Sequence, residues 1–238
     1  MRMSFAAVTI AFGLFSLPAW AQPAPNIGVA ATVVDKMEGT VSTNKRVIGR
    51  GDKVYKDEVV ETAERGKGQL LFLDETTLTV GPNSRVTLDR FVYDPSRSTG
   101  TVTMTAARGV FRFVSGSLPS QAYEIKTPAG SIGVRGTIFE LICEADGTVI
   151  VRLLEGGIVF TTLARQQVAL TRPGQVLVIR PNGTTTINNG LTDRQTALLQ
   201  PIVDFGAGAV TPGQDRRDQL RDQLRGGGGG QGSPPPSD

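Results

Sequence analysis

The chain has 238 residues with a formal net charge of +3, and it contains no histidine and a single cysteine. The absence of histidine excludes Ser-His-Asp and Cys-His catalysis and any imidazole metal site. One cysteine excludes an internal disulfide, and the acids and bases are interspersed, without the basic cluster of a dedicated nucleic-acid binder.

The first 21 residues have the three parts of a secretory signal peptide. Arg2 gives a basic start, residues 5–17 form an apolar run, and Ala19-Trp20-Ala21 is a small-x-small cleavage site. The apolar run is shorter than the ~20 residues that span a bilayer, which favours a cleaved peptide over a retained anchor. We therefore predict cleavage after Ala21 and a mature protein that is periplasmic, or secreted beyond the periplasm, and has no membrane span.

Residues 32–189 have the pattern of short strands separated by turns. Val102 and Met104, for example, alternate with threonines and share one face. Asp146-Gly147 predicts a two-residue hairpin turn with positive φ at both positions. In chain order, the predicted strands are residues 33–41, 57–62, 69–73, 78–80, 85–93, 101–105, 110–114, 123–126, 138–143, 148–154, 158–162, 168–170, 176–179 and 184–187.

No amphipathic helix lies between these strands, which excludes a parallel sheet with crossover helices. Strands at spacings of roughly 8–12 residues predict an all-β fold, built as a sandwich, a roll or a short β-solenoid. After these strands, residues 191–201 are expected to form a short helix that Thr192 caps and Pro201 ends.

The last residues, 212–238, contain an Arg-Asp-Gln-Leu repeat, five consecutive glycines and three consecutive prolines. This composition predicts a disordered tail, with docking to a partner as the alternative. The predicted units are the signal peptide (1–21), a β domain (32–189), a short helix with a linker (190–211) and the tail (212–238).

Residues 127–140 hold three closely spaced glycines, Gly130, Gly133 and Gly136, among apolar residues. Glycine within a β pattern marks a bend or a close approach of two backbones, so we expect these glycines to shape the tight start of a strand. A phosphate-binding loop would need a helix to follow, and none is predicted.

Two single residues have alternative interpretations. The guanidinium of Arg135 either satisfies backbone carbonyls or pairs with a carboxylate such as Glu155, or else it is exposed and binds an anion of a partner or glycan. Cys143 alternates with Phe139 and Leu141, which favours a buried, inert thiol over a reactive or intermolecular one.

Two adjacent acid pairs, Asp57-Glu58 and Asp74-Glu75, are the other candidates for chemistry. Glycoside hydrolysis needs two carboxylates that face each other at ~5–9.5 Å, whereas neighbours in a strand point to opposite faces. We therefore place both pairs in turns or on a solvated edge. The sequence predicts no catalytic, cofactor-binding or metal site.

Several motifs, in order, resemble a FecR domain over residues 32–160. They are Gly39-Thr40-Val41, Gly51-Asp52, a strand ending at Thr62, residues 71–74, Pro82-Asn83-Ser84, Thr127-Pro128, Gly133-Val134-Arg135-Gly136-Thr137 with Phe139, and Glu155-Gly156. The resemblance implies an all-β, non-enzymatic periplasmic or extracellular domain that binds a partner. The regulator that names the family is similar to a sigma-factor controller with a cytoplasmic segment and a transmembrane helix. Neither is expected here, so sigma-factor control is not carried over to this secreted, stand-alone domain.

We therefore expect a non-enzymatic binding or scaffold module of the bacterial cell envelope. Its partner would be an envelope protein or a polysaccharide, with no cofactor and no nucleic acid. Two alternatives stay open: an envelope-sensing component that works with a separate signalling partner, and a β-roll polysaccharide lyase or hydrolase that uses arginine, lysine, tyrosine or paired acids.

Overall fold

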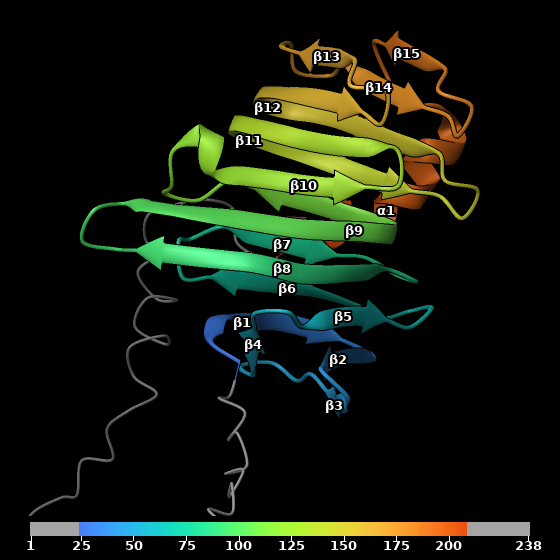
Figure 1. The fold of residues 1–238 in the computed structure, drawn as a ribbon. Helices are drawn as coiled ribbons and strands as arrows, with labels where there is room; N and C mark the ends of the chain where they lie inside the picture. Colours follow the sequence, from blue (N-terminus) through green and yellow to red (C-terminus); the bar gives the residue numbers. More distant parts are fainter. Residues whose placement is uncertain (1–23, 209–238) are drawn as a thin grey trace, which may run out of the picture.

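A computed structural model describes residues 24–208 (Figure 1). The predicted signal peptide (1–21) and the predicted tail (212–238) lie outside the described residues. Within these residues a single 15-stranded sheet carries one α-helix at its C-terminal end, which confirms the all-β prediction.

The strands are short at both ends of the chain and long in its middle. They are β1 (Asn26–Val34), β2 (Met37–Val41), β3 (Asn44–Val47), β4 (Lys53–Tyr55), β5 (Val59–Thr62), β6 (Lys67–Phe72), β7 (Thr77–Val80), β8 (Arg85–Asp94), β9 (Thr99–Val114), β10 (Tyr123–Thr127), β11 (Gly130–Cys143), β12 (Val149–Thr162), β13 (Gln167–Leu170), β14 (Val176–Ile179) and β15 (Thr185–Asn188). A 3-10 turn, Ser120–Ala122, precedes β10, and helix α1 covers Asp193–Gly208.

The sheet folds back on itself as a roll, because three long strands serve two layers. The first part of β9 pairs with β8 and β10, and its second part pairs with β7 and β11. Likewise, β12 begins beside β14 and ends beside β13. We call the layer with β1, β6, β7, β14 and β15 the helix-side layer, and the layer with β2, β5, β8, β10 and β13 the open layer.

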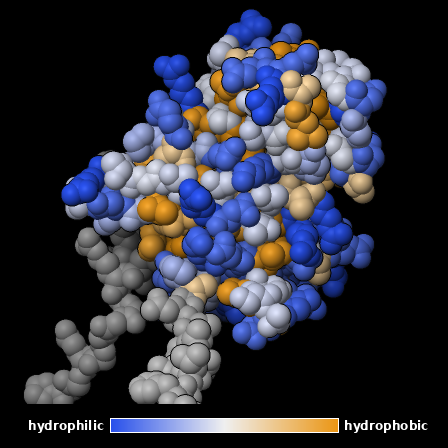
Figure 2. Space-filling model, viewed as in Figure 1, coloured by the Kyte–Doolittle hydropathy of each residue, from blue (hydrophilic) through white to orange (hydrophobic). Residues whose placement is uncertain are grey.

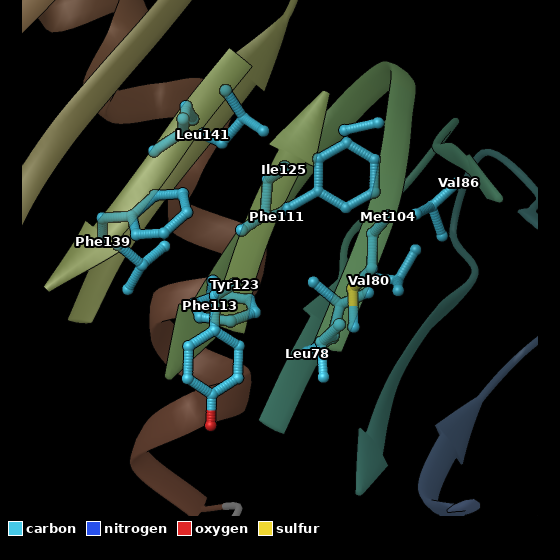
Figure 3. Packing of buried hydrophobic residues seen from close by; sticks show 14 of the residues in the cluster. Leu78, Val80, Val86, Met104, Phe111, Phe113, Tyr123, Ile125, Phe139 and Leu141 are labelled. Carbon is cyan, nitrogen blue, oxygen red and sulfur yellow. The ribbon is translucent and has the colours of Figure 1, made fainter. Parts of the chain in front are cut away.

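The main hydrophobic core fills the space between the two layers. Phe113 stacks on Phe139 with ring centroids 5.3 Å apart and meets Tyr123 edge-on at 5.8 Å (Figure 3). A cavity of about 10 Å³ lies among the side chains of Leu78, Val86, Met104, Ala106, Phe111, Phe113, Ile125, Phe139 and Leu141. A second apolar cluster lies on the outer side of the helix-side layer, where Leu199 and Ile202 of α1 pack on Val110, Ile142, Ile150, Val176 and Val178.

The structure divides the strands differently from the sequence prediction in several places, among them β11, which begins at Gly130 and not at residue 138. The predicted pairs 101–105 with 110–114 and 148–154 with 158–162 are each one continuous strand, β9 and β12. The predicted strand 33–41 is two strands, because Asp35 (φ 57°) turns the chain between β1 and β2. Strands β3 and β4 were not predicted; their polar, short sequences lack a clear alternation.

The hairpin at Asp146-Gly147 is confirmed, but the predicted turn type is wrong. Glu144 N donates to Thr148 O at 2.9 Å, which leaves three residues in the loop. Only Gly147 has positive φ (88°), and the Asp146 carboxylate accepts from Thr148 N at 2.8 Å. Because its side chain bonds two residues ahead, Asp146 takes part in this turn without itself adopting a left-handed conformation.

The predicted N-cap of the helix is confirmed, whereas its predicted end is wrong. Gln195 N donates to Thr192 Oγ1 at 3.3 Å and Thr192 N donates to Gln195 Oε1 at 2.9 Å, which is a reciprocal capping box. Pro201 lies inside α1. Because Leu199 and Ile202 on either side of it are buried against the sheet, packing outweighs the lost backbone hydrogen bond.

Candidate functional site

The motif segment of residues 127–139 begins as a hairpin and continues through a bend. Strands β10 and β11 meet at Thr127 and Gly130, with Pro128 in the turn between them, and Thr127 Oγ1 donates to Gly130 O at 2.9 Å. The predicted tight start of a strand is therefore at Gly130. Gly136 lies in the middle of β11, where the pairing with β12 shifts between Arg135 and Ile138.

Two glycines from different strands form this β-bulge. Gly136 has φ 56° and Gly156 of β12 has φ 75°. A Cβ atom at residue 156 would lie 1.8 Å from the Gly136 carbonyl oxygen, so only glycine fits there. The bulge marks the point at which β11 and β12 pass from one layer of the roll to the other.

Thr137 ties the bulge to the strands around it. Its buried hydroxyl donates to Gly157 O at 2.6 Å and accepts from Arg135 N at 3.2 Å. Its own backbone N–H donates to Ser115 Oγ at 3.0 Å. The residues on either side, Val134 and Phe139, are buried in the main core. These residues of the motif segment therefore hold the bend in place.

The interpretation of Arg135 as a buried, paired guanidinium is wrong. The Arg135 side chain is exposed, as is Glu155, and no ion pair or side-chain hydrogen bond of Arg135 occurs among residues 24–208. The reason is strand alternation, since Val134 points into the core and its neighbour must point outwards. The exposure agrees with the alternative interpretation, in which Arg135 binds an anion of a partner or glycan, and that binding stays a prediction.

The surface around these motifs is polar. The side of the molecule that carries β8 and β10 in front is mainly hydrophilic, and its apolar patches are small and separate (Figure 2). Along the open layer, the outward residues include Lys126, Ser131 and Thr161, which lie side by side in register. This side of the molecule therefore presents mainly polar groups to solvent.

Cys143 lies on the inward face with Phe139 and Leu141, as predicted from their alternation. It is 3% exposed, and its thiol lies 3.5 Å from the carbonyl oxygen of Ala106. Burial raises the pKa of the thiol to about 12, so the reactive thiolate is suppressed at neutral pH.

The prediction for the two acid pairs is half right. Both pairs lie in turns, where Asp57 (φ 63°) and Glu75 (φ 70°) adopt left-handed conformations. The solvated-edge prediction is wrong for Glu58 and Asp74, which are fully buried. Neither acid pair signals this burial by itself, because the groups that satisfy these carboxylates come from residues outside each pair.

Glu58 is held by one arginine and one backbone donor. Arg46 Nε and Nη2 donate to Glu58 Oε1 at 3.1 and 2.8 Å, and Tyr55 N donates to Oε2 at 2.9 Å. Gly39, the first residue of the Gly-Thr-Val motif, leaves room for this carboxylate, since a Cβ there would lie 2.0 Å from Oε1. The motif glycine and the buried ion pair are therefore one structural unit.

Asp74 joins the β6–β7 turn to the segment that follows β9. Its carboxylate accepts from Thr76 N at 3.1 Å, from Thr76 Oγ1 at 2.6 Å and from Tyr123 Oη at 2.9 Å. Its backbone carbonyl accepts from Ser117 N and Ser117 Oγ. Burial raises the pKa of Asp74 and, with the nearby Asp74 charge, raises the pKa of Tyr123 as well. This cluster has one acid and no facing carboxylate, so it lacks the pair that glycoside hydrolysis requires.

A row of three charged side chains, which we call the charged row, crosses the helix-side layer and was not predicted from the sequence. Arg112, Glu140 and Arg152 are direct cross-strand neighbours on β9, β11 and β12. The fully buried Glu140 Oε1 accepts from Arg112 Nε at 3.2 Å, and Oε2 lies 2.8 Å from Arg152 Nη2. With two half-buried arginines on one glutamate, the row carries a net charge of +1.

None of these clusters has the arrangement of an active site. Among the described residues, no group of three or more cysteine, aspartate or glutamate side chains is placed to hold a metal ion. The carboxylates of the buried acids Glu58, Asp74 and Glu140 each bond to an arginine, a hydroxyl group or a backbone N–H. Over the same residues, no helix has the length and apolar character that a membrane crossing requires.

The FecR protein family model matches residues 58–159. The chain contains a FecR domain. The matched FecR region begins at the buried Glu58 and ends in the second half of β12, so it includes the Asp74 cluster, the charged row and the Gly136–Gly156 bulge. Strands β1 to β4 and β13 to β15 lie outside the match, as does α1.

No curated protein matches the chain. Two crystal structures, at 2.50 and 1.65 Å resolution, show a protein from Parabacteroides distasonis ATCC 8503 that is provisionally described as an anti-sigma factor. Both are 16% identical to this chain, cover 60% of it, and superpose with TM-scores of 0.47 and 0.46. The chain spans 64% of the length of that protein.

Proposed function

We propose that this protein is a non-enzymatic binding module of the bacterial cell envelope, and that it acts in the periplasm or outside the cell after cleavage behind Ala21. The observation that carries the proposal is the position of the FecR match. Residues 58–159 form strands β5 to β12, in which the buried acids Glu58, Asp74 and Glu140 are bonded to neighbouring residues, while Arg135 of the motif is exposed. These contacts support a domain that binds a partner through its polar surface.

The FecR match also favours the envelope-sensing alternative, because a sensor domain needs a stable surface to which a partner protein binds. In this second candidate function, the domain reports on the state of an envelope partner to a separate signalling protein. The two functions share the binding step and differ in what the partner does next.

The first experiment isolates the tagged full-length protein from the envelope fraction of the organism that produces it. We expect the mature chain to begin at Gln22 by N-terminal sequencing, and one envelope protein or polysaccharide to co-purify at a constant ratio. Turnover of bacterial polysaccharides by the same preparation, abolished by one carboxylate or arginine substitution, would overturn the non-enzymatic proposal. A protein that retains residues 1–21 would overturn the proposed location.

A further inference from the structure

The two ends of the open sheet differ in charge. Strands β3 and β4 lie at one end, and β13 and β15 lie at the other (Figure 1). β3 contains Lys45 and Arg46, and β4 contains Lys53, which is how natural proteins discourage a further strand from pairing with an edge. β13 (Gln-Val-Ala-Leu) and β15 (Thr-Thr-Ile-Asn) contain no charged residue.

This second end, which we call the β13/β15 edge, comprises two separate strand edges, because β13 pairs with β12 directly whereas β15 is joined to β12 only through β14. Both strands have backbone groups free to pair. Each of these strands has one neighbour in the sheet. Arg180 N donates to Thr184 O at 2.9 Å, and because alternate residues of an antiparallel strand bond to the same partner, Thr185 and Ile187 direct their N–H and C=O groups outwards. The same reasoning from Thr162 N to Gln166 O gives Gln167 and Ala169 on β13.

The hydrophobic core is incompletely covered at this edge. Ile187 pairs with Leu177, a fully buried core residue, so both side chains lie on the same face of the sheet. Ile187 is nevertheless 46% exposed, because within residues 24–208 β15 has a neighbouring strand on one side only. Val168 of β13 pairs with the buried Phe160 and is half-buried. A further strand along either edge would extend the core.

Positive charge surrounds the β13/β15 edge. Residues 156–192 contain Arg165, Arg172 and Arg180 and no acid, which is a formal charge of +3 within this segment. The three arginines lie on the turns β12–β13, β13–β14 and β14–β15, so they are distributed along the whole edge. All three are exposed, and none forms an ion pair with another residue of the described range 24–208.

We propose that β13, within the β13/β15 edge, binds an extended segment of another protein by strand addition, and that acidic residues flank the part of that segment which pairs. The unpaired backbone groups of β13 select an extended chain, the half-buried Val168 selects apolar or β-branched side chains, and the three arginines select negative charge. The inference rests on the proposed binding function and names its site and partner class.

Two other occupants fit the charges less well. A second copy of this chain, paired through the same edge, would bring both sets of three unpaired arginines together. Residues 209–238 of this chain contain four arginines and four aspartates, so they carry no net negative charge to match the edge. An acidic segment of a different protein avoids both problems.

The experiment places a photo-crosslinking amino acid, p-benzoylphenylalanine, at Gln167 on the β13/β15 edge. The matched control places it at Lys45 on β3, at the opposite end of the sheet. The full-length protein is produced in its own organism, irradiated, and the cross-linked peptide is identified by mass spectrometry. We expect the Gln167 position to cross-link to a net-negative, non-helical segment of one envelope protein, at a yield at least fivefold above that of the Lys45 position.

Two sets of variants test the recognition itself. Replacing the three arginines together (Arg165→Gln, Arg172→Gln and Arg180→Gln) should lower the cross-linking yield at least fivefold, whereas the same triple change to lysine should keep most of it. Ala169→Pro removes an outward N–H of β13 and leaves the β12–β13 ladder intact, so it should abolish the cross-link. Ile187→Pro, which removes an outward N–H from the separate edge of β15, should not. Unfolding temperature is measured for each variant, and the arginine series carries the test if Ala169→Pro does not fold.

The possible results separate the inference from the proposed function. Equal yields from Gln167 and Lys45, a cross-link to a second copy or to residues 209–238, or an unchanged yield in the glutamine triple variant would each overturn the inference. If a partner co-purifies but Gln167 gives no cross-link, the binding function stands and this site is wrong. If nothing co-purifies and nothing cross-links, both are wrong.

Discussion

Removing the Glu140 carboxylate tests how strongly the charged row holds β9, β11 and β12 together. Glu140 is fully buried, and the Arg112 and Arg152 side chains are 21% and 27% exposed. In Glu140→Ala the two guanidinium groups remain half-buried without their counter-charge. Removing one member of a buried ion pair costs about 3–5 kcal/mol, and the partial exposure of both arginines favours the lower end, about 3 kcal/mol.

A loss of this size is a large part of the 5–15 kcal/mol that stabilises a typical domain. With an m value of about 2 kcal/mol/M, the midpoint of urea unfolding should fall by about 1.5 M. The assay is equilibrium unfolding followed by circular dichroism. The matched control is Glu155→Ala, an exposed carboxylate near the bulge of β12, which should change stability by less than about 0.5 kcal/mol.

A triple variant separates charge imbalance from lost packing. Arg112→Met, Glu140→Leu and Arg152→Met together remove every charge of the row while keeping most of its volume, and such replacements are often neutral or stabilising. We expect this protein to be within about 1 kcal/mol of the wild type. A loss below about 1 kcal/mol for Glu140→Ala, or a triple variant as unstable as the single one, would refute the reasoning.

Three further predictions concern the bulge, a buried acid and the thiol. Gly156→Ala should prevent stable folding because its Cβ would meet Gly136 O, whereas Gly136→Ala has open space and should cost only about 1–2 kcal/mol for its positive φ; similar unfolding temperatures for both would contradict this. Burial raises the pKa of Asp74, so the wild type loses stability as pH rises through the interval between its unfolded and folded pKa values. Asp74→Asn, which does not titrate, should therefore gain in unfolding temperature relative to the wild type between pH 3 and 7, and a difference independent of pH would disprove the linkage. A thiol reagent at pH 8 should label Cys143 only after unfolding; rapid labelling of the folded protein would show that the thiol is accessible.

Features determined by neighbouring residues were predictable from the sequence. Alternation placed Cys143 with Leu141 and Val102 with Met104 on inward faces, and local polar spacing identified the Thr192 cap. The same rule applied to Val134 would have placed Arg135 outside. The error came from reading the apolar neighbours as burial of the whole segment, although a strand buries only alternate residues.

Features that depend on pairing between distant residues were not predictable. Glu58 is buried because Arg46 reaches it from β3, and Glu140 is buried because β9 and β12 bring an arginine to each side. The short segment 101–114 looked like two strands because Gly109 interrupts its pattern, yet the chain bends there without leaving the sheet. The register between strands and the points where strands cross between layers depend on contacts between distant residues of the roll. The pattern of neighbouring residues therefore does not predict them.

The layer crossing links two motifs of the sequence, Gly-Val-Arg-Gly-Thr (residues 133–137) and Glu-Gly (residues 155–156). β11 and β12 are paired along most of their length, so neither strand can bend into the other layer unless its partner bends at the same point. Gly136 and Gly156 provide the two bends: a Cβ atom at residue 156 would collide with the Gly136 carbonyl oxygen, whereas at residue 136 the positive φ favours glycine. Thr137 then closes the bend by bonding to Gly157 O. Because the two glycines meet at one bulge, the two motifs form a single structural element, and this geometry accounts for Gly136, Thr137 and Gly156 without assigning them to a ligand.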